Sequence, residues 1–146
     1  MADQGLSYAI RPATAGDELN AILSAALDAA RSARGGLALV TQIWGEDLSP
    51  DHIAERLRGD IAAGRLWIAE ADDAVIAGAL VGEGCLRAVW VDPPYRRRGV
   101  ARALVNRVLT SDHPPRDAWA LPGDRATKSL YESVGWKARL LTMRGE

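Results

Sequence analysis

The 146-residue chain contains no Phe, one Cys and two His, and its 18 Lys and Arg nearly balance its 19 Asp and Glu. One cysteine cannot form an internal disulfide, and with two histidines it does not complete a four-ligand zinc site. The net charge of −1 argues against a dedicated nucleic-acid binder. No apolar run approaches the roughly 18 residues of a membrane-spanning helix, and residues 1–7 carry no signal-peptide pattern. We therefore expect a cytoplasmic protein with no metal, membrane or nucleic-acid partner.

Small aliphatic side chains dominate what is present. Hydrophobic residues make up 48% of the chain, with 26 Ala and 33 Leu, Ile and Val, and five Trp supply most of the aromatic bulk. A chain of this length is typical of one domain, and such a domain can bury a core without disulfides.

The periodicity of apolar residues predicts an α/β (α+β) single domain in the order β-α-α-β-β-β-α-β-α-β. Strands are expected at residues 7–11, 66–70, 75–81, 85–91, 117–121 and 136–143. Helices are expected to begin near Thr14, Pro50, Arg98 and Asp124. The run from Leu37 to Trp44 fits a helix or a strand, and Asp72-Asp73 predicts a tight hairpin.

One segment of the sequence indicates a chemistry, and it reads Val91-Asp-Pro-Pro-Tyr-Arg-Arg-Arg-Gly-Val-Ala101. A strand ends in prolines, a basic loop follows, and an amphipathic helix begins at once. The first N–H groups of a helix have no intrahelical partner, and the helix dipole makes this end positive. Gly99 allows a close approach to the backbone. The segment predicts an anion site that suits a pyrophosphate, and a nucleotide, a phosphosugar or coenzyme A would each fit.

Three motifs in order resemble the GCN5-related N-acetyltransferase (GNAT) family. The family's strand end before its pyrophosphate loop is similar to Val91-Asp92-Pro93. The pyrophosphate loop itself is similar to Arg96-x-x-Gly99-x-Ala101. Ile10–Asp17 resembles its opening strand and first helix start, and Ser129–Trp136 resembles its late helix. The resemblance implies a mixed, mostly antiparallel sheet flanked by about four helices. It assigns residues 8–146 to an N-acetyltransferase domain after a short tail, residues 1–7.

The resemblance also implies the co-substrate acetyl-CoA and the residues that bind it. Strand backbone pairs with the pantetheine arm, and loop N–H groups hold the pyrophosphate. The corresponding positions are Val89, Trp90, Val91, Arg96, Arg97, Arg98, Gly99, Val100, Ala101 and Arg102. Tyr131 matches the tyrosine that protonates the departing thiolate, and a phenol with a pKa of about 10 suits that role.

Two departures from the family pattern concern carboxylates. Asp124 stands where Asn is common, and an N-cap role suits it. The strand 85–91 has no carboxylate to act as general base. Glu83, Glu70 and Asp117 are alternatives that act through water, and none is distinguished by its surroundings.

The acceptor is expected to be an amine on a small molecule or a peptide. Its site is expected within residues 33–50, with candidate lining residues Thr41, Gln42, Trp44, Glu46 and Asp47. Trp44 and Trp67 suit an aromatic floor or simply the core. Cys85 lacks a partner motif for covalent catalysis, which favours direct transfer in a ternary complex.

Alternatives of other classes stay open. One is a non-catalytic acyl-CoA-binding sensor or interaction protein on the same fold. Another, an RNA-binding module that uses Arg96 to Arg98, is disfavoured by the net charge of −1. The sequence leaves the oligomeric state open. An exposed last strand would offer an edge on which a second subunit could pair to form a homodimer.

Overall fold

The computed structural model describes residues 6–32, 36–121, 124–143 and 145. Within these residues the strands are β1 (Ala9–Pro12), β2 (Leu66–Ala71), β3 (Ala74–Gly82), β4 (Cys85–Val91) and β5 (Asp117–Ala118). The helices are α1 (Leu19–Ser32), α2 (Gly36–Trp44), α3 (Pro50–Ala62), α4 (Val100–Leu109) and α5 (Arg125–Ser133), with a short 3-10 turn η1 (Pro93–Tyr95). No helix of this described part is long and apolar enough to cross a membrane.

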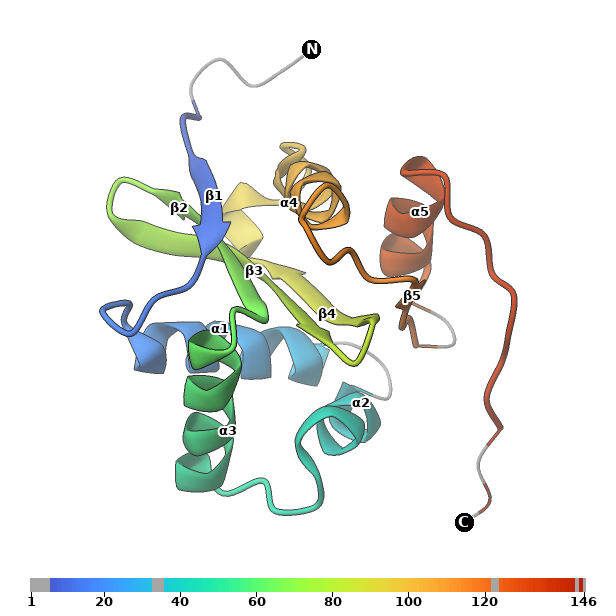
Figure 1. Ribbon diagram of the computed structural model, residues 1–146, viewed down its shortest axis with the longest axis horizontal. Coiled ribbons are helices and arrows are strands. Elements are labelled where there is room, and N and C mark those ends of the chain that lie inside the picture. The colour runs from blue at the N-terminus through green and yellow to red at the C-terminus, as the bar shows by residue number, and fades with distance from the viewer. Residues whose placement is uncertain (1–5, 33–35, 122–123, 144, 146) are drawn as a thin grey trace.

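The strands form one sheet in the order β1-β2-β3-β4-β5, antiparallel except for the parallel pair β4–β5. Helices α1, α2 and α3 pack on one face, and α4 and α5 pack on the other (Figure 1). The predicted α/β class and mostly antiparallel sheet are confirmed. The described residues contain five α-helices rather than about four, because the ambiguous run 37–44 lies in α2. Val40, Ile43 and Trp44 are buried at helical spacing there.

The hairpins that bring β4 into the sheet are specified locally. Asp72 and Asp73 both have positive φ angles, 50° and 62°, as the tight two-residue turn between β2 and β3 requires. Glu83 and Gly84 repeat this geometry between β3 and β4, with φ of 52° and 76°. Gly78 on β3 lies under the indole of Trp90, and a Cβ at that position would overlap the ring. These turns fix which face each β4 side chain occupies.

The first helix begins later than the sequence pattern suggests. The Asp17 carboxylate accepts hydrogen bonds from the Thr14 backbone N–H at 2.6 Å and from Arg11 at 2.6 and 2.9 Å. The hydrogen bond from Arg11 is the main cause that lowers the pKa of Asp17 to about 2. The Thr14–Asp17 motif therefore shapes a turn that ties β1 to the entry of α1, which starts at Leu19.

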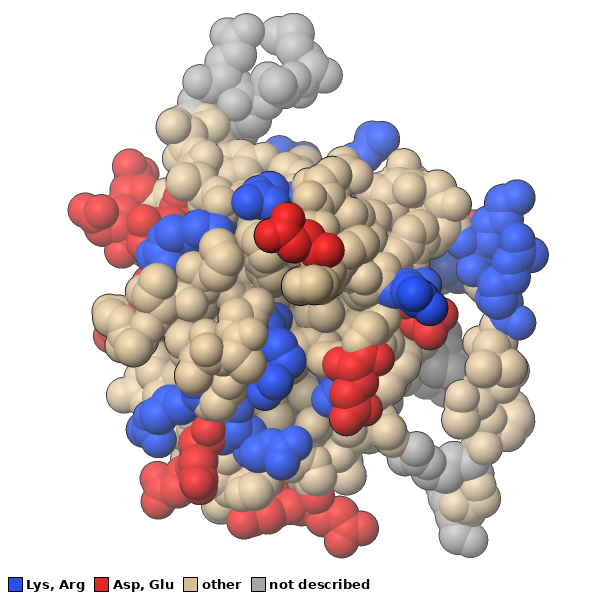
Figure 2. Space-filling model, viewed as in Figure 1, with Lys and Arg blue, Asp and Glu red and all other residues tan. Residues whose placement is uncertain are grey.

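The predicted strand 136–143 is wrong. Residues 136–143 follow α5 without sheet pairing. Trp136 still packs against the α4–α5 cluster, 6.1 Å from the Tyr131 ring, and Figures 1 and 2 show the extended segment after it standing away from the body. Leu140, Leu141 and Met143 are 91%, 67% and 83% exposed. The neighbouring β5 covers two residues instead of the predicted 117–121. A strand forms only where an edge receives its backbone groups, and so short a strand supplies little edge.

Candidate functional site

The sheet opens between β4 and β5. These strands pair at Cys85–Asp117 and Leu86–Ala118, and the Trp119 N–H then donates to the Leu86 carbonyl at 3.0 Å. Beyond this point no ladder pairing joins β4 to the described residues that follow β5. Ala88, Val89 and Val91 are half-exposed, although β4 is an inner strand. The inner strand thus offers free edge to a strand-like ligand.

Backbone alternation decides which β4 residues face the opening. The Asp92 N–H donates to the Ile76 carbonyl of β3 at 2.9 Å, in register with the Trp90–Gly78 pair. In an antiparallel ladder, alternate residues face the same neighbour. The backbone groups of Val89 and Val91 therefore face the opening, whereas those of Trp90 face β3.

The loop after β4 presents the uncapped start of α4. Arg97 and Gly99 have positive φ angles of 62° and 80°. The first helical bond runs from the Ala103 N–H to the Gly99 carbonyl at 3.0 Å, and the helix has no side-chain cap. The preceding N–H groups, those of residues 100–102, thus point out of the helix. A Cβ on Gly99 would meet nothing within 4 Å, so the Gly99 backbone borders open space at the start of the helix.

Two arginine side chains, those of Arg96 and Arg102, stabilise the loop and the start of α4 through hydrogen bonds. The Arg96 Nε donates to the Val91 carbonyl at 2.9 Å and folds the loop back on the end of β4. The Arg102 Nη2 donates to the Ser133 carbonyl at 3.3 Å and ties α4 to α5. Arg97 is exposed and Arg98 is half-exposed. The positive end of α4 therefore lies among guanidinium groups, an arrangement suited to a phosphate-bearing ligand.

Tyr131 of α5 lies at the point where the strands separate. Its side chain is 7% exposed, and its hydroxyl donates to the Trp119 carbonyl at 3.1 Å. Burial is the main cause that raises its pKa, and Cys85 and Asp124 add to the effect. The phenol therefore keeps its proton at neutral pH. The opened strands, the loop and this hydroxyl together form a site that can hold a phosphate-bearing ligand and donate a proton.

Other ionisable groups have clear structural positions. Burial raises the pKa of the Cys85 thiol to about 11, which disfavours a thiolate nucleophile. The Asp124 carboxylate accepts from the Thr127 N–H at 3.1 Å and is the N-cap of α5. Glu70 pairs with Arg11 at 3.1 Å on β1, away from β4. Asp117 is exposed at the start of β5, and Glu83 is 90% exposed in the hairpin before β4.

A sequence model described as "Acetyltransferase (GNAT) domain" matches residues 62–138, more than half of the chain. The chain belongs to the GNAT acetyltransferase family. The matched region includes the loop, α4 and Tyr131, and the family resemblance predicted from the sequence is confirmed. No curated protein matches the chain.

Solved GNAT structures share the fold. The ribosomal-protein-alanine N-acetyltransferase from Brucella melitensis is 25% identical, with a TM-score of 0.67 over 87% of this chain and 83% of that one. AAC(6')-Iy in complex with the bisubstrate analogue CoA-S-monomethyl-acetylneamine is 21% identical, with a TM-score of 0.61 over 96% and 99%. Diaminobutyrate acetyltransferase EctA from Paenibacillus lautus, in complex with L-2,4-diaminobutyric acid and coenzyme A, is 19% identical, with a TM-score of 0.62 over 89% and 75%.

The predicted acceptor region of this GNAT protein is divided between the core and the surface. Residues 33–35 lie outside the described residues, and Thr41 and Gln42 lie on α2. Trp44 is 5% exposed and Trp67 is 9% exposed, so both fill the core. They do so on opposite faces of the sheet, and Trp67 lies under Arg107 of α4 at 4.9 Å. The two rings therefore do not form one aromatic floor.

The loop after Trp44 has a local structural role. The Asp47 carboxylate accepts from the Ser49 N–H at 3.0 Å, and this hydrogen bond is the main cause that lowers its pKa. Glu46 is exposed. Asp47 thus stabilises the turn that leads into α3.

Sequence reasoning missed Arg87, which lies beside the opening. Arg87 is the one charged residue of β4, and it stacks on Trp119 with its guanidinium carbon 5.4 Å from the ring centroid. A charge inside an apolar strand was the available signal. Asp92 follows β4, and burial is the main cause that raises its pKa, while Arg96 lowers it and Asp28 raises it.

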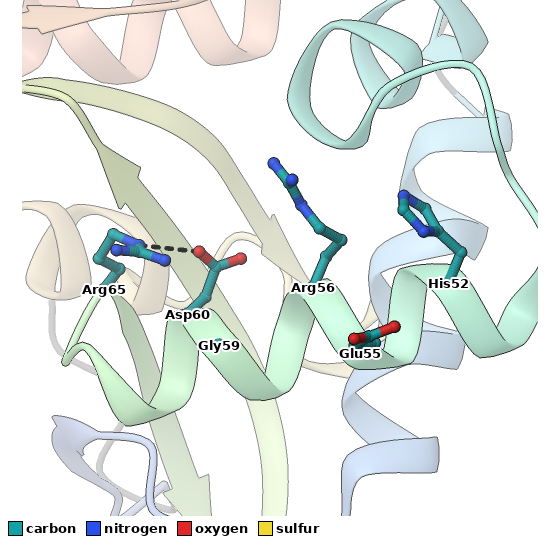
Figure 3. Close-up of a pocket in the computed structure, with 6 residues that line it drawn as sticks. All are labelled: His52, Glu55, Arg56, Gly59, Asp60 and Arg65. Atoms are coloured by element: carbon teal, nitrogen blue, oxygen red, sulfur yellow. Dashed lines mark hydrogen bonds and ion pairs between the residues drawn. The ribbon is translucent and has the colours of Figure 1, made fainter.

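A separate surface pocket of about 490 Å³ lies along α3 (Figure 3). Its lining residues are His52, Glu55, Arg56, Gly59, Asp60 and Arg65. Asp60 and Arg65 pair at 2.8 Å. The α3 pocket is on the sheet face opposite α4, and none of the predicted site residues lines it.

Proposed function

We propose that this GNAT protein is an acetyl-CoA-dependent N-acetyltransferase that acts on an amine by direct transfer in a ternary complex, in the cytoplasm. The observation that carries the proposal is the continuity of the free β4 edge with the uncapped start of α4. The free edge suits a pantetheine amide chain, and the helix start suits a pyrophosphate. A single linear ligand that has both an amide chain and a pyrophosphate would bind the β4 edge and the helix start at once.

In this proposal, backbone groups of β4 and of the loop before α4 bind acetyl-CoA, and a charged side chain positions the loop. The backbone groups of Val89 and Val91 pair with the pantetheine arm, while Trp90 holds the strand in place through its buried ring. The N–H groups of the loop and first helical turn bind the pyrophosphate, and their residues are Arg97, Arg98, Gly99, Val100, Ala101 and Arg102. Arg96 positions the loop through the Val91 carbonyl.

Tyr131 supplies the proton in the transfer step. The neutral amine nitrogen bonds to the thioester carbonyl carbon, and the carbon–sulfur bond breaks with its electron pair left on sulfur. The departing thiolate takes the Tyr131 proton, and the proton that the nitrogen loses passes through water and restores the phenol. The Trp119 carbonyl orients this hydroxyl before reaction. The buried thiol of Cys85, with its raised pKa, supports direct transfer over an acetyl-cysteine intermediate.

A free-thiol assay across an amine panel tests the proposed activity. Purified protein with acetyl-CoA should release thiol in the presence of an amine and not in its absence. Thermal denaturation should show stabilisation by acetyl-CoA, because a ligand that binds only the folded state raises its stability. Stabilisation without thiol release for any amine would instead indicate an acyl-CoA-binding sensor. The absence of both effects would contradict the cofactor assignment.

A second copy of the chain is the partner we propose for residues 136–143. Leu140, Leu141 and Met143 are exposed, and an extended segment has backbone groups available for pairing. Replacing both Leu140 and Leu141 with Asp should convert a dimer to a monomer in size-exclusion chromatography with light scattering. Leu48→Asp changes another exposed leucine, 36% exposed, and should leave the dimer intact. A monomeric wild type at micromolar concentration would contradict this proposal.

A further inference from the structure

The Arg87 side chain is held between Trp119 and Gly82, a position that we call the Arg87 socket. The proposed transfer step does not use it. Its guanidinium lies against the Trp119 ring, 5.4 Å from the centroid. Gly82 leaves room beside it, since a Cβ there would come within 2.9 Å of the Arg87 Nε. The side chain is 18% exposed, and its buried Nε has no hydrogen-bond partner among the described residues. The guanidinium is held in position but keeps part of its surface open to solvent.

The socket lies across the sheet opening from Tyr131. Trp119 is the residue at which β4 and β5 separate, and its carbonyl accepts the Tyr131 hydroxyl. Trp119 packs on the α1–α3 face of the sheet, whereas Tyr131 belongs to the α4–α5 face. Arg87 and the proposed proton donor therefore contact the same residue, Trp119, from opposite faces of the sheet.

The carboxylate that now pairs with Arg87 is easily displaced. The Glu83 Oε2 lies 3.2 Å from the Arg87 Nη2, and the Glu83 side chain is 90% exposed. Such a pair is weak because water competes for both charges. A ligand carboxylate that is partly desolvated would replace it, because a planar guanidinium binds a carboxylate through two parallel hydrogen bonds.

We propose that Arg87 binds a carboxylate of the acceptor, and that the acceptors are therefore amines that carry a carboxylate, such as amino acids. This inference rests on the proposed function. The same guanidinium repels a second ammonium group at this position, which disfavours polyamines. Arg87 is a specificity-determining residue, and Trp119 and Gly82 are the residues that position it.

Matched amine pairs that differ by one carboxylate test the inference. Examples are 2,4-diaminobutyrate with 1,3-diaminopropane, and ornithine with putrescine. Wild-type protein should show a higher kcat/KM for the carboxylated member. Arg87→Met should lower that kcat/KM by about 30- to 100-fold, mainly through KM, as expected for loss of a partly buried charge pair. It should leave the KM for acetyl-CoA unchanged. The rate with the decarboxylated member should not fall, and it should rise if the guanidinium repels the second ammonium of that diamine.

Three variants make the test specific. Arg107→Met removes another arginine stacked on a tryptophan, at 4.9 Å from Trp67, and should change neither member of a pair. Arg87→Lys should restore part of the preference. Glu83→Gln removes the competing carboxylate and should lower the KM for carboxylated amines by about 2- to 5-fold. If Arg87→Met does not fold, the KM values of Glu83→Gln for carboxylated amines test the inference instead.

The outcomes separate this inference from the proposed function. Thiol release with amines that lack a carboxylate, and equal or lower activity with their carboxylated partners, would keep the function and overturn the inference. Without thiol release for any amine, the function fails, and calorimetric titration of the same pairs in the presence of coenzyme A decides the inference. The carboxylated member must then bind at least about 10-fold more tightly to the wild type than to Arg87→Met, which corresponds to about 1.4 kcal/mol. Equal binding, or no binding, would overturn it.

Discussion

Gly99→Glu is expected to weaken acetyl-CoA binding by more than about 100-fold. Gly99 has a φ of 80° and is the residue directly before α4, and a side chain at this position would project into open space. A carboxylate there would occupy the proposed pyrophosphate position and repel its charge, a desolvated contact worth about 3 kcal/mol or more. Isothermal titration of acetyl-CoA measures the loss, and thermal denaturation with the ligand should no longer show stabilisation.

Gly64→Glu is the matched control for this variant. Gly64 has a φ of 72° at the end of α3, and a Cβ there also meets nothing within 4 Å. Both variants impose left-handed strain of about 1–2 kcal/mol, but only Gly99 precedes the proposed anion site. Unchanged affinity in Gly99→Glu, or an equal loss in Gly64→Glu, would refute the placement of the pyrophosphate.

Tyr131→Phe is expected to lower kcat by about 100-fold or more while changing the Kd for acetyl-CoA little, because general acid catalysis typically contributes about 10²–10⁴-fold. Steady-state kinetics with the best amine of the panel measures the first effect, and titration measures the second. The pKa of Tyr131 is raised above its ordinary value of about 10. Ionisation of Tyr131 should therefore cause no fall in the wild-type kcat between about pH 7 and 9.

Stability and an unrelated tyrosine serve as controls for Tyr131. Removing the hydroxyl leaves the Trp119 carbonyl without its donor and should cost about 1 kcal/mol of unfolding free energy. Since the folded-state pKa is raised, the stabilising effect of the protonated phenol is complete below about pH 10 and declines at higher pH. Tyr8→Phe should leave kcat unchanged. A kcat for Tyr131→Phe within about twofold of wild type would remove Tyr131 from the acid role.

Elements with local signals were predicted well. Asp72-Asp73 forms a tight turn because short acidic residues tolerate positive φ. Pro50 begins α3 because a missing N–H costs nothing in the first turn. Asp124 caps α5 because its carboxylate reaches the N–H three residues on. The segment 37–44 was ambiguous because its apolar run fits both periods, and burial against the α1–α3 face decides for a helix.

The sequence by itself determined the site features that a continuous segment builds. A strand end, Gly99 and a helix start all lie within residues 89–102, so their order alone predicts the proposed anion site. Tertiary structure decided what depends on distant partners. The predicted strand 136–143 is unpaired because β5 is too short to receive it. Trp44 and Trp67 separate because the sheet lies between their faces. Arg87 meets Trp119 and Gly82 only after three strands assemble, since such contacts join residues that no local pattern relates.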